Sequence, residues 1–151
     1  MVQRTLMILF IFLISCSSDD DLSKENTEFV KAIEKWQSFG YENYMITERI
    51  SCYCYGVLVK DVFVQNGVKE KVEFDESMLP EGQTYEDVFN HSKTIEDAFL
   101  FIDNLLKQNP DGLTIEYDAE YGFPTVISID YNFNMVDDEV AYLYNNFVIL
   151  N

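Results

Sequence analysis

The feature that most constrains the fold is the order of hydrophobic patterns along the chain. Three segments with apolar residues at alternate positions precede a helical segment, and three more follow it. Short connections within each group imply antiparallel pairing. We therefore predict an α+β fold with an N-terminal helix, an antiparallel three-strand meander, one or two helices and a second antiparallel three-strand meander, the helices packing on one face of the sheet.

The helices are the clearest predictions. Apolar residues at helical spacing predict an N-terminal helix over residues 27–38 that ends at Gly40, and a second helix whose stripe runs from residue 95 to residue 106. Thr84 and Thr94 each precede a helical pattern and have an aspartate three residues later. Both threonines are therefore predicted N-caps, with the carboxylates at the positive end of each helix.

The first group of strands contains two irregularities. From residue 44 the even positions form the more apolar face, and Glu48 interrupts that face, which indicates a bulge or an open sheet edge. In the next strand, residues 57–64, the apolar phase changes between Val59 and Val62. This change predicts a second bulge near Asp61.

Asn66 and Gly67 indicate the hairpin turn after that strand. A two-residue loop would place valines of one strand on the face of lysines of the next. A three-residue loop over residues 65–67 aligns the valines instead, so the hydrophobic register favours it, with Gly67 in the left-handed conformation.

The N-terminus has the three parts of a secretory signal peptide: Arg4, the apolar run of residues 6–14, and a small residue, Ser15. That run is shorter than the ~20 residues of a membrane-spanning helix. Ser15 before Cys16 resembles a bacterial lipobox, which implies cleavage before Cys16 and acylation of the new N-terminus; the alternative is an ordinary signal peptide. The predicted organisation is a cleaved signal over 1–15, a lipidated acidic tether over 16–26 and one globular domain over 27–151.

The acidic residues after Cys16 predict a location. Serines followed by Asp19, Asp20 and Asp21 resemble the export signal that sends Bacteroidota lipoproteins to the surface of the outer membrane. The expectation is an outer-membrane lipoprotein on the cell surface, anchored by palmitate-type acyl chains, with the periplasmic face as the alternative. A solvated linker would have the same composition.

Composition limits the partners. The chain has 27 acidic and 10 basic residues, a formal net charge of −17, which disfavours binding to nucleic acid. Its 12 Phe, 10 Tyr and 1 Trp supply enough bulky material for a packed core. Disorder of the whole chain is excluded on these grounds.

A set of short motifs occurs in a fixed order along the chain: Trp36, Tyr41 with Tyr44, Cys52-Tyr53-Cys54, Tyr117-Asp118, Tyr121-Gly122-Phe123-Pro124, and Asp130 before Asp137-Asp138-Glu139. Together these motifs resemble a domain-of-unknown-function family of bacterial, Bacteroidota-type secreted lipoproteins. The resemblance covers residues 29–141 and implies class and location but no activity.

Cys52 and Cys54 are the cysteines that stay free if Cys16 is lipidated. Two residues apart in a flat strand they are too distant for a disulfide, so a bridge requires a local bend. A structural disulfide, two packed thiols and a redox or metal role are the alternatives. His91, the one histidine, is expected in an exposed polar link between helical stretches.

The acidic turn that follows residue 129 is the sharpest indication of a ligand. Oxygen side chains at positions 1, 3 and 5 match the start of a calcium loop, but position 6 is not glycine and position 12 is not glutamate, so it is not an EF-hand. A looser calcium site and a solvated Asx turn are the alternatives. The candidate metal ligands are Asp130, Asn132, Asn134, Asp137, Asp138 and Glu139.

No known catalytic motif occurs in the sequence. The favoured hypothesis is therefore a non-enzymatic binding or structural module of the envelope, with a protein or glycan as partner. One alternative is a hydrolase that uses paired carboxylates. Another is a structural module stabilised by calcium.

Replacing Asp19, Asp20 and Asp21 with alanine tests the predicted location. If these residues direct surface export, the variant loses accessibility to protease added to intact cells, while the unaltered protein is cleaved. The matched control is Cys16→Ala, which is expected to leave the membrane fraction altogether. Undiminished cleavage of the triple variant would contradict the export signal.

Overall fold

The structure is a computed structural model that describes the backbone of residues 19–151 and the side chains of residues 26–151. The predicted signal peptide and Cys16 lie outside the described residues. The described elements are α1 (Asp19–Phe39), β1 (Tyr44–Cys52), β2 (Val59–Gln65), β3 (Val68–Glu73), a 3₁₀ turn (Glu76–Met78), α2 (Tyr85–His91), α3 (Ile95–Gln108), β4 (Gly112–Tyr117), β5 (Pro124–Asp130) and β6 (Val140–Ile149).

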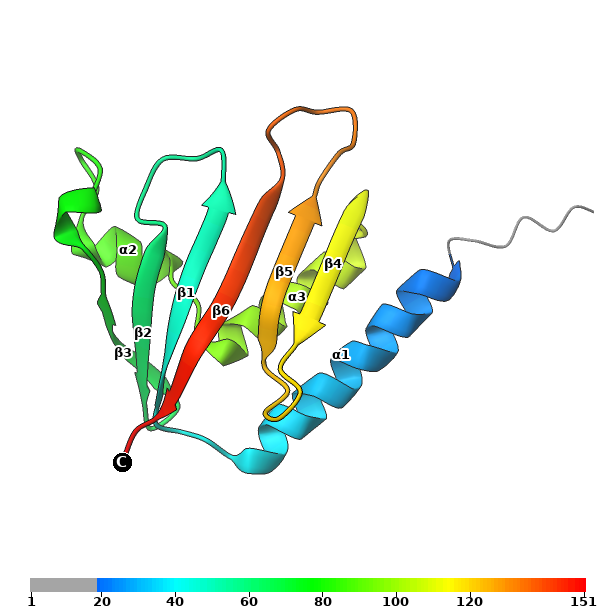
Figure 1. The fold of residues 1–151 in the computed structure, drawn as a ribbon, viewed down its shortest axis with the longest axis horizontal. Helices are drawn as coiled ribbons and strands as arrows, with labels where there is room; N and C mark the ends of the chain where they lie inside the picture. Colours follow the sequence, from blue (N-terminus) through cyan, green and yellow to red (C-terminus); the bar gives the residue numbers. More distant parts are fainter. Residues whose placement is uncertain (1–18) are drawn as a thin grey trace, which may run out of the picture.

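The strands form one open, six-stranded antiparallel sheet in the order β3-β2-β1-β6-β5-β4. With its three α-helices, the protein is an α+β fold, as the sequence predicts. In Figure 1, α2 and α3 cross behind the strands, and α1 runs past the hairpin between β4 and β5. No helix within residues 19–151 is long and apolar enough to cross a membrane.

Both predicted N-caps are confirmed. Thr84 and Thr94 each accept a hydrogen bond from the backbone N–H of the aspartate three residues on, and that aspartate accepts one in return. The apolar stripe of α3 is buried along its length. The helix ends at Asn109, which adopts the left-handed conformation and donates its N–H to the carbonyl of Leu105.

The first helix ends before Gly40, as predicted, but begins at Asp19 instead of residue 27. Residues 19–26, predicted to belong to the tether, are therefore helical. Aspartate is a favoured residue at a helix N-terminus because the helix macrodipole stabilises negative charge there. The prediction used the spacing of apolar residues, and that spacing contains no information about charge at the helix N-terminus.

The predicted three-residue hairpin loop is wrong. Gln65 pairs with Val68, so Asn66 and Gly67 alone form the turn, with positive φ at both residues. This turn twists in the same sense as the strands it joins. The register shifts between Phe63 and Val64, where the extra residue lies in β3. Val62 therefore pairs with Val72, whereas Val64 faces Lys69.

The two irregularities predicted at Glu48 and near Asp61 have a single cause, and it is not a bulge. The pairing of β1 with β2 is regular, with Glu48 opposite Lys60. Both side chains point to the buried face, where the Lys60 Nζ lies 3.2 Å from the Glu48 Oε2. Glu48 is 0 % exposed and Lys60 4 %. The apolar alternation therefore contains one buried ion pair.

The connection between β4 and β5 fixes the position of α1. Asp118 Oδ1 accepts the N–H groups of residues 120 and 121, and the ammonium of Lys35 on α1 donates to the carbonyl of Ala119. Gly122 has φ +86°, and a Cβ there would lie 2.7 Å from the carbonyl oxygen of Ala32 on α1. The positive φ and the close approach of α1 are therefore two separate reasons for glycine at this position.

Candidate functional site

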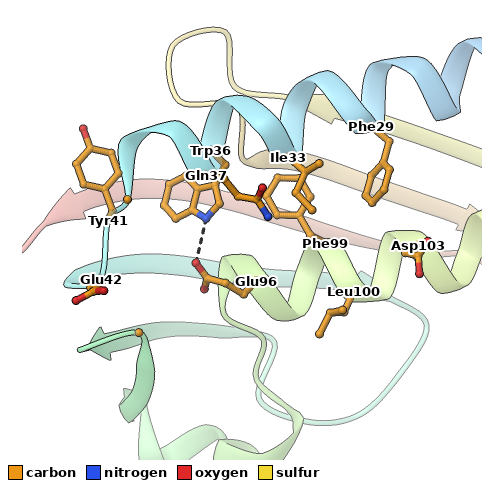
Figure 2. Close-up of a pocket in the computed structure, with 12 residues that line it drawn as sticks. Phe29, Ile33, Trp36, Gln37, Tyr41, Glu42, Glu96, Phe99, Leu100 and Asp103 are labelled. Atoms are coloured by element: carbon orange, nitrogen blue, oxygen red, sulfur yellow. Dashed lines mark hydrogen bonds between the residues drawn. The ribbon is translucent and has the colours of Figure 1, made fainter.

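A groove between α1 and α3 is the largest hollow that we describe, with a volume of about 690 Å³. Figure 2 shows the two helices on either side of it, with side chains from both directed into it. The turn at Gly67 contributes to the lining. The residues that line the groove are Phe29, Ile33, Trp36, Gln37, Gly40, Tyr41, Glu42, Gly67, Glu96, Phe99, Leu100 and Asp103.

The floor of the groove is aromatic. Trp36 of α1 is buried and packs edge-on against Tyr44 of β1, with ring centroids 5.5 Å apart. Phe29 and Phe99 make a similar edge contact between α1 and α3 at 6.1 Å. The Phe29–Phe99 contact therefore joins α1 to α3, and the Trp36–Tyr44 contact joins α1 to the sheet.

One carboxylate is built into this floor. Glu96, in the first turn of α3, accepts a hydrogen bond from the indole Nε1 of Trp36 at 3.0 Å and another from the hydroxyl of Tyr44 at 2.5 Å. Burial, and then the negative charge of Glu96, raise the pKa of the Tyr44 phenol. The phenol therefore stays protonated and acts as a donor to Glu96 at all physiological pH values.

Side chains of β1 determine where α3 begins. The N–H of Ile95, the first residue of α3, donates to the Tyr44 hydroxyl at 3.0 Å. Two residues earlier, the N–H of Lys93 donates to Glu48 Oε2 at 3.3 Å. The N–H of Ile95 is one of the first donors of the helix, which have no intrahelical partner, and the N–H of Lys93 lies just before the N-cap, Thr94. The sheet thus positions the helix that carries Glu96.

A second polar cluster lies under α3. The Tyr144 hydroxyl donates to Glu48 Oε1 at 3.2 Å, so the carboxylate of the buried ion pair also has a hydrogen-bond donor from β6. Lys93 extends over the ring of Tyr142, with its Nζ 4.2 Å from the centroid. Burial lowers the pKa of Lys93, whereas the nearby charge of Glu48 opposes that shift.

The cysteines lie at the end of β1, away from the groove. A disulfide joins Cys52 to Cys54 with Cα atoms 5.2 Å apart, so the chain bends locally there. Tyr53 and Tyr55 beside them are each 86 % exposed. Cys52 is the last residue of β1 and Cys54 lies in the irregular segment between β1 and β2, where the chain can make the local bend that a bridge requires.

His91 is the last residue of α2 and not part of a loop, a correction to the expectation from its polar neighbours. Its Nδ1 lies 2.6 Å from the carbonyl oxygen of Asp87, one helical turn earlier. It is exposed at the rim of a smaller hollow of about 400 Å³ that Cys54 and Lys60 also line.

The predicted metal ligands form a turn of Asx type. Asp130 Oδ1 accepts the N–H of Asn132, and Asn132 Oδ1 accepts the N–H of Asn134. Burial, followed by the charge of Asp138, raises the pKa of Asp130. Both carboxylate oxygens of Asp138 are buried without a hydrogen-bond partner.

Asp137 and Glu139 are exposed on the same loop. Within the part of the chain that the structure describes, no three His, Cys, Asp or Glu side chains are arranged to hold a metal ion. The loop therefore concentrates negative charge without gathering its acidic side chains around one point. The calcium site stays a prediction.

Sequence reasoning did not identify Glu96 or Tyr44 as partners. Glu96 reads as an acidic residue at a helix start, and Tyr44 lies 52 residues away from it in the chain. Glu48 and Lys60 did leave a signal, because each interrupts an apolar face on one of two adjacent strands. The two interruptions, considered together, would have predicted that Glu48 and Lys60 form a pair.

A family model described as a family of unknown function (DUF6174) matches residues 28–149. This match agrees with the resemblance to a domain-of-unknown-function family. No curated protein and no solved structure matches the chain.

Substitution of Asp138 by asparagine tests the calcium prediction. Without calcium, Asp138→Asn is expected to raise the melting temperature at pH 7 by roughly 2–8 °C, the change that ~1 kcal/mol produces, because it removes a buried charge that has no partner. Burial, and then the negative charge of Asp138, raise the pKa of Asp130. As pH falls and Asp130 becomes protonated, its repulsion with Asp138 disappears, so the gain from Asp138→Asn shrinks towards pH 3.

Calcium is expected to stabilise the unaltered protein relative to chelator, by about 2.7 kcal/mol at a hundredfold excess over Kd, and to leave Asp138→Asn unchanged. The matched control is Asp111→Asn, which also lowers negative charge near Asp130 but lies outside the predicted ligand set. Identical melting curves with calcium and with chelator would remove the calcium site.

Proposed function

Because the chain belongs to the family of unknown function DUF6174, we propose its function from its own geometry: a non-enzymatic binding module of the cell envelope that receives a ligand in the groove between α1 and α3. In this proposal the three helices cover one face of a sheet made of two three-strand meanders. The strand order and the contacts of Trp36 and Ile95 with Tyr44 support that layout.

The observation that carries the proposal is the aromatic groove itself. Its volume of about 690 Å³ lies in the ~300–1,000 Å³ range of small-molecule sites. Phe29, Ile33 and Tyr41 remain half-buried and Leu100 is 64 % exposed, so apolar surface is left open to a ligand. Leaving such surface in water is unfavourable, and an apolar ligand that covers it gains the corresponding free energy.

The location belongs to the same proposal. We place the protein at the outer membrane through a lipid on Cys16, on the cell surface, with the periplasmic face as the alternative. The lipobox-like sequence before Cys16 and the acidic residues after it support this location. An anchored module needs no large interface with the membrane, and its acidic domain stays clear of anionic lipid.

Calcium stabilisation is a second candidate function, and the buried, unpartnered carboxylate of Asp138 favours it. A hydrolase with paired carboxylates also stays a prediction. Asp130, whose carboxyl pKa is raised, lies in the acidic loop and does not line the groove.

Binding of an uncharged apolar dye such as Nile red to the purified protein tests the groove. Leu100→Gln is expected to weaken dye binding about tenfold, because it removes an apolar wall. Fully covering a leucine contributes ~1.5–3 kcal/mol, and the lower end of that range, about tenfold in affinity, applies to a side chain that is already partly buried. Leu100 is already 64 % exposed, so the substitution spares the core. The dye's fluorescence and the melting temperature are measured together.

The matched control is Val30→Gln. Val30 lies on α1, is 48 % exposed and does not line the groove. It should leave the dye affinity unchanged. Equal affinity of both variants and the unaltered protein would contradict the groove as the binding site.

A further inference from the structure

The charged side chains that line the groove are all acidic. Its lining includes three carboxylates, Glu42, Glu96 and Asp103, and none of the described lining residues is a lysine, arginine or histidine. Asp103 is already paired with Lys107 on the next turn of α3, with its Oδ2 2.5 Å from the Nζ. The uncompensated negative charge therefore belongs to Glu42 and Glu96.

These two carboxylates lie at the same end of the groove. Figure 2 shows Tyr41, Glu42 and Glu96 towards one end and Phe29 with Asp103 towards the other. The contacts agree, because Trp36 meets Glu96 at the start of α3 whereas Phe29 meets Phe99 one turn later. The groove thus has an acidic end and an apolar remainder.

Glu96 keeps capacity for a further partner. Its two hydrogen bonds come from neutral donors, an indole and a phenol, so its negative charge is not cancelled. Each carboxylate oxygen has two lone pairs and accepts one of these bonds, which leaves one position on each. Glu96 is exposed as a residue, so a ligand can reach it.

Aromatic rings beside the acidic end favour a cation in particular. The negative face of an aromatic ring attracts a cation within about 6 Å of its centroid. Tyr41 is half-buried and next to Glu42 in sequence, and both residues line the groove, as does the indole of Trp36 beside Glu96. The net charge of −17 adds a field that draws cations to the protein and repels anions.

We propose that the groove binds an organic ammonium ion with an apolar body, its cationic group at Glu42 and Glu96 and its body along Phe29, Ile33 and Leu100. This inference rests on the proposed function and specifies the ligand class. A soluble amine is the occupant, because the groove has the volume of a small-molecule site and the acidic end needs only one positive charge.

Three probes of similar size separate charge from apolar contact: phenethylammonium, 2-phenylethanol and 3-phenylpropionate. Trp36 is the single tryptophan and lines the groove, so its intrinsic fluorescence reports occupancy. The expected order of affinity is cation, then alcohol, then carboxylate. Added salt should weaken the cation alone, because it screens the carboxylates.

Glu42→Gln and Glu96→Gln should each weaken phenethylammonium roughly two- to fivefold, the effect of a partly exposed ion pair, and leave 2-phenylethanol unchanged. The control, Glu81→Gln, removes an equal charge from an exposed loop that does not line the groove. Glu81→Gln should leave the affinities for all three probes unchanged. If it weakens phenethylammonium as much as Glu42→Gln and Glu96→Gln do, the cation does not bind at a local site in the groove, and the proposal is wrong.

The outcomes distinguish this inference from the proposed function. If 2-phenylethanol binds as tightly as phenethylammonium, the ammonium preference is wrong and the groove as an apolar site stands. If neither phenethylammonium nor 2-phenylethanol binds while Nile red does, the proposed ligand class is wrong. If no probe and no dye binds, both proposals are wrong.

Discussion

The carboxylate of Glu48 connects more of this molecule than any other group that we describe. It lies at the centre of the sheet on β1, pairs with Lys60 on β2, accepts the hydroxyl of Tyr144 on β6 and accepts the backbone N–H of Lys93 before α3. A buried carboxylate is costly unless charge and hydrogen bonds compensate it, and here both do. The rest of the site follows from that arrangement.

The groove depends on the start of α3. Tyr44 and Glu48 both face inward on β1. Tyr44 accepts the N–H of Ile95, the first residue of the helix, and donates to Glu96, whereas Glu48 accepts the N–H of Lys93 just before the helix. The other wall, α1, is fixed by the loop between β4 and β5, where Gly122 permits close approach. Two rigid supports from different parts of the sheet therefore set the width of a groove that neither helix would form alone.

The sequence predicts the α+β class, the threonine caps and the buried stripe of α3, because each depends on residues close together in the chain. It predicts the hairpin loop wrongly, because the choice of loop depends on a bulge in β3 that compensates the shorter turn. Most contacts of the candidate site cannot be predicted from the sequence. The Tyr44–Glu96 contact joins residues 52 positions apart, and each has an adequate local explanation without the other.

The pair Glu48 and Lys60 lies between these two cases. In the sequence, each residue interrupts the apolar pattern of its own strand. Only the register of β1 with β2, which places Glu48 opposite Lys60, shows that the two interruptions form one ion pair. A one-residue slip of β2 would carry Lys60 to the opposite face and leave Glu48 unpaired, so the pair also specifies the register. An apolar pair would pack as well at this position. We infer that the protein has an ion pair there because the ion pair specifies the register of the strands.

A double-mutant cycle on this pair tests the account most directly, with urea unfolding of Glu48→Gln, Lys60→Met and the combined variant. The account predicts that each single substitution lowers the free energy of unfolding by about 3–5 kcal/mol, because it leaves a buried charge alone. The combined variant should lose less than the sum, with a coupling energy of roughly 1–3 kcal/mol. Losses that add to within about 0.5 kcal/mol would show that the two residues act independently, and would contradict the account.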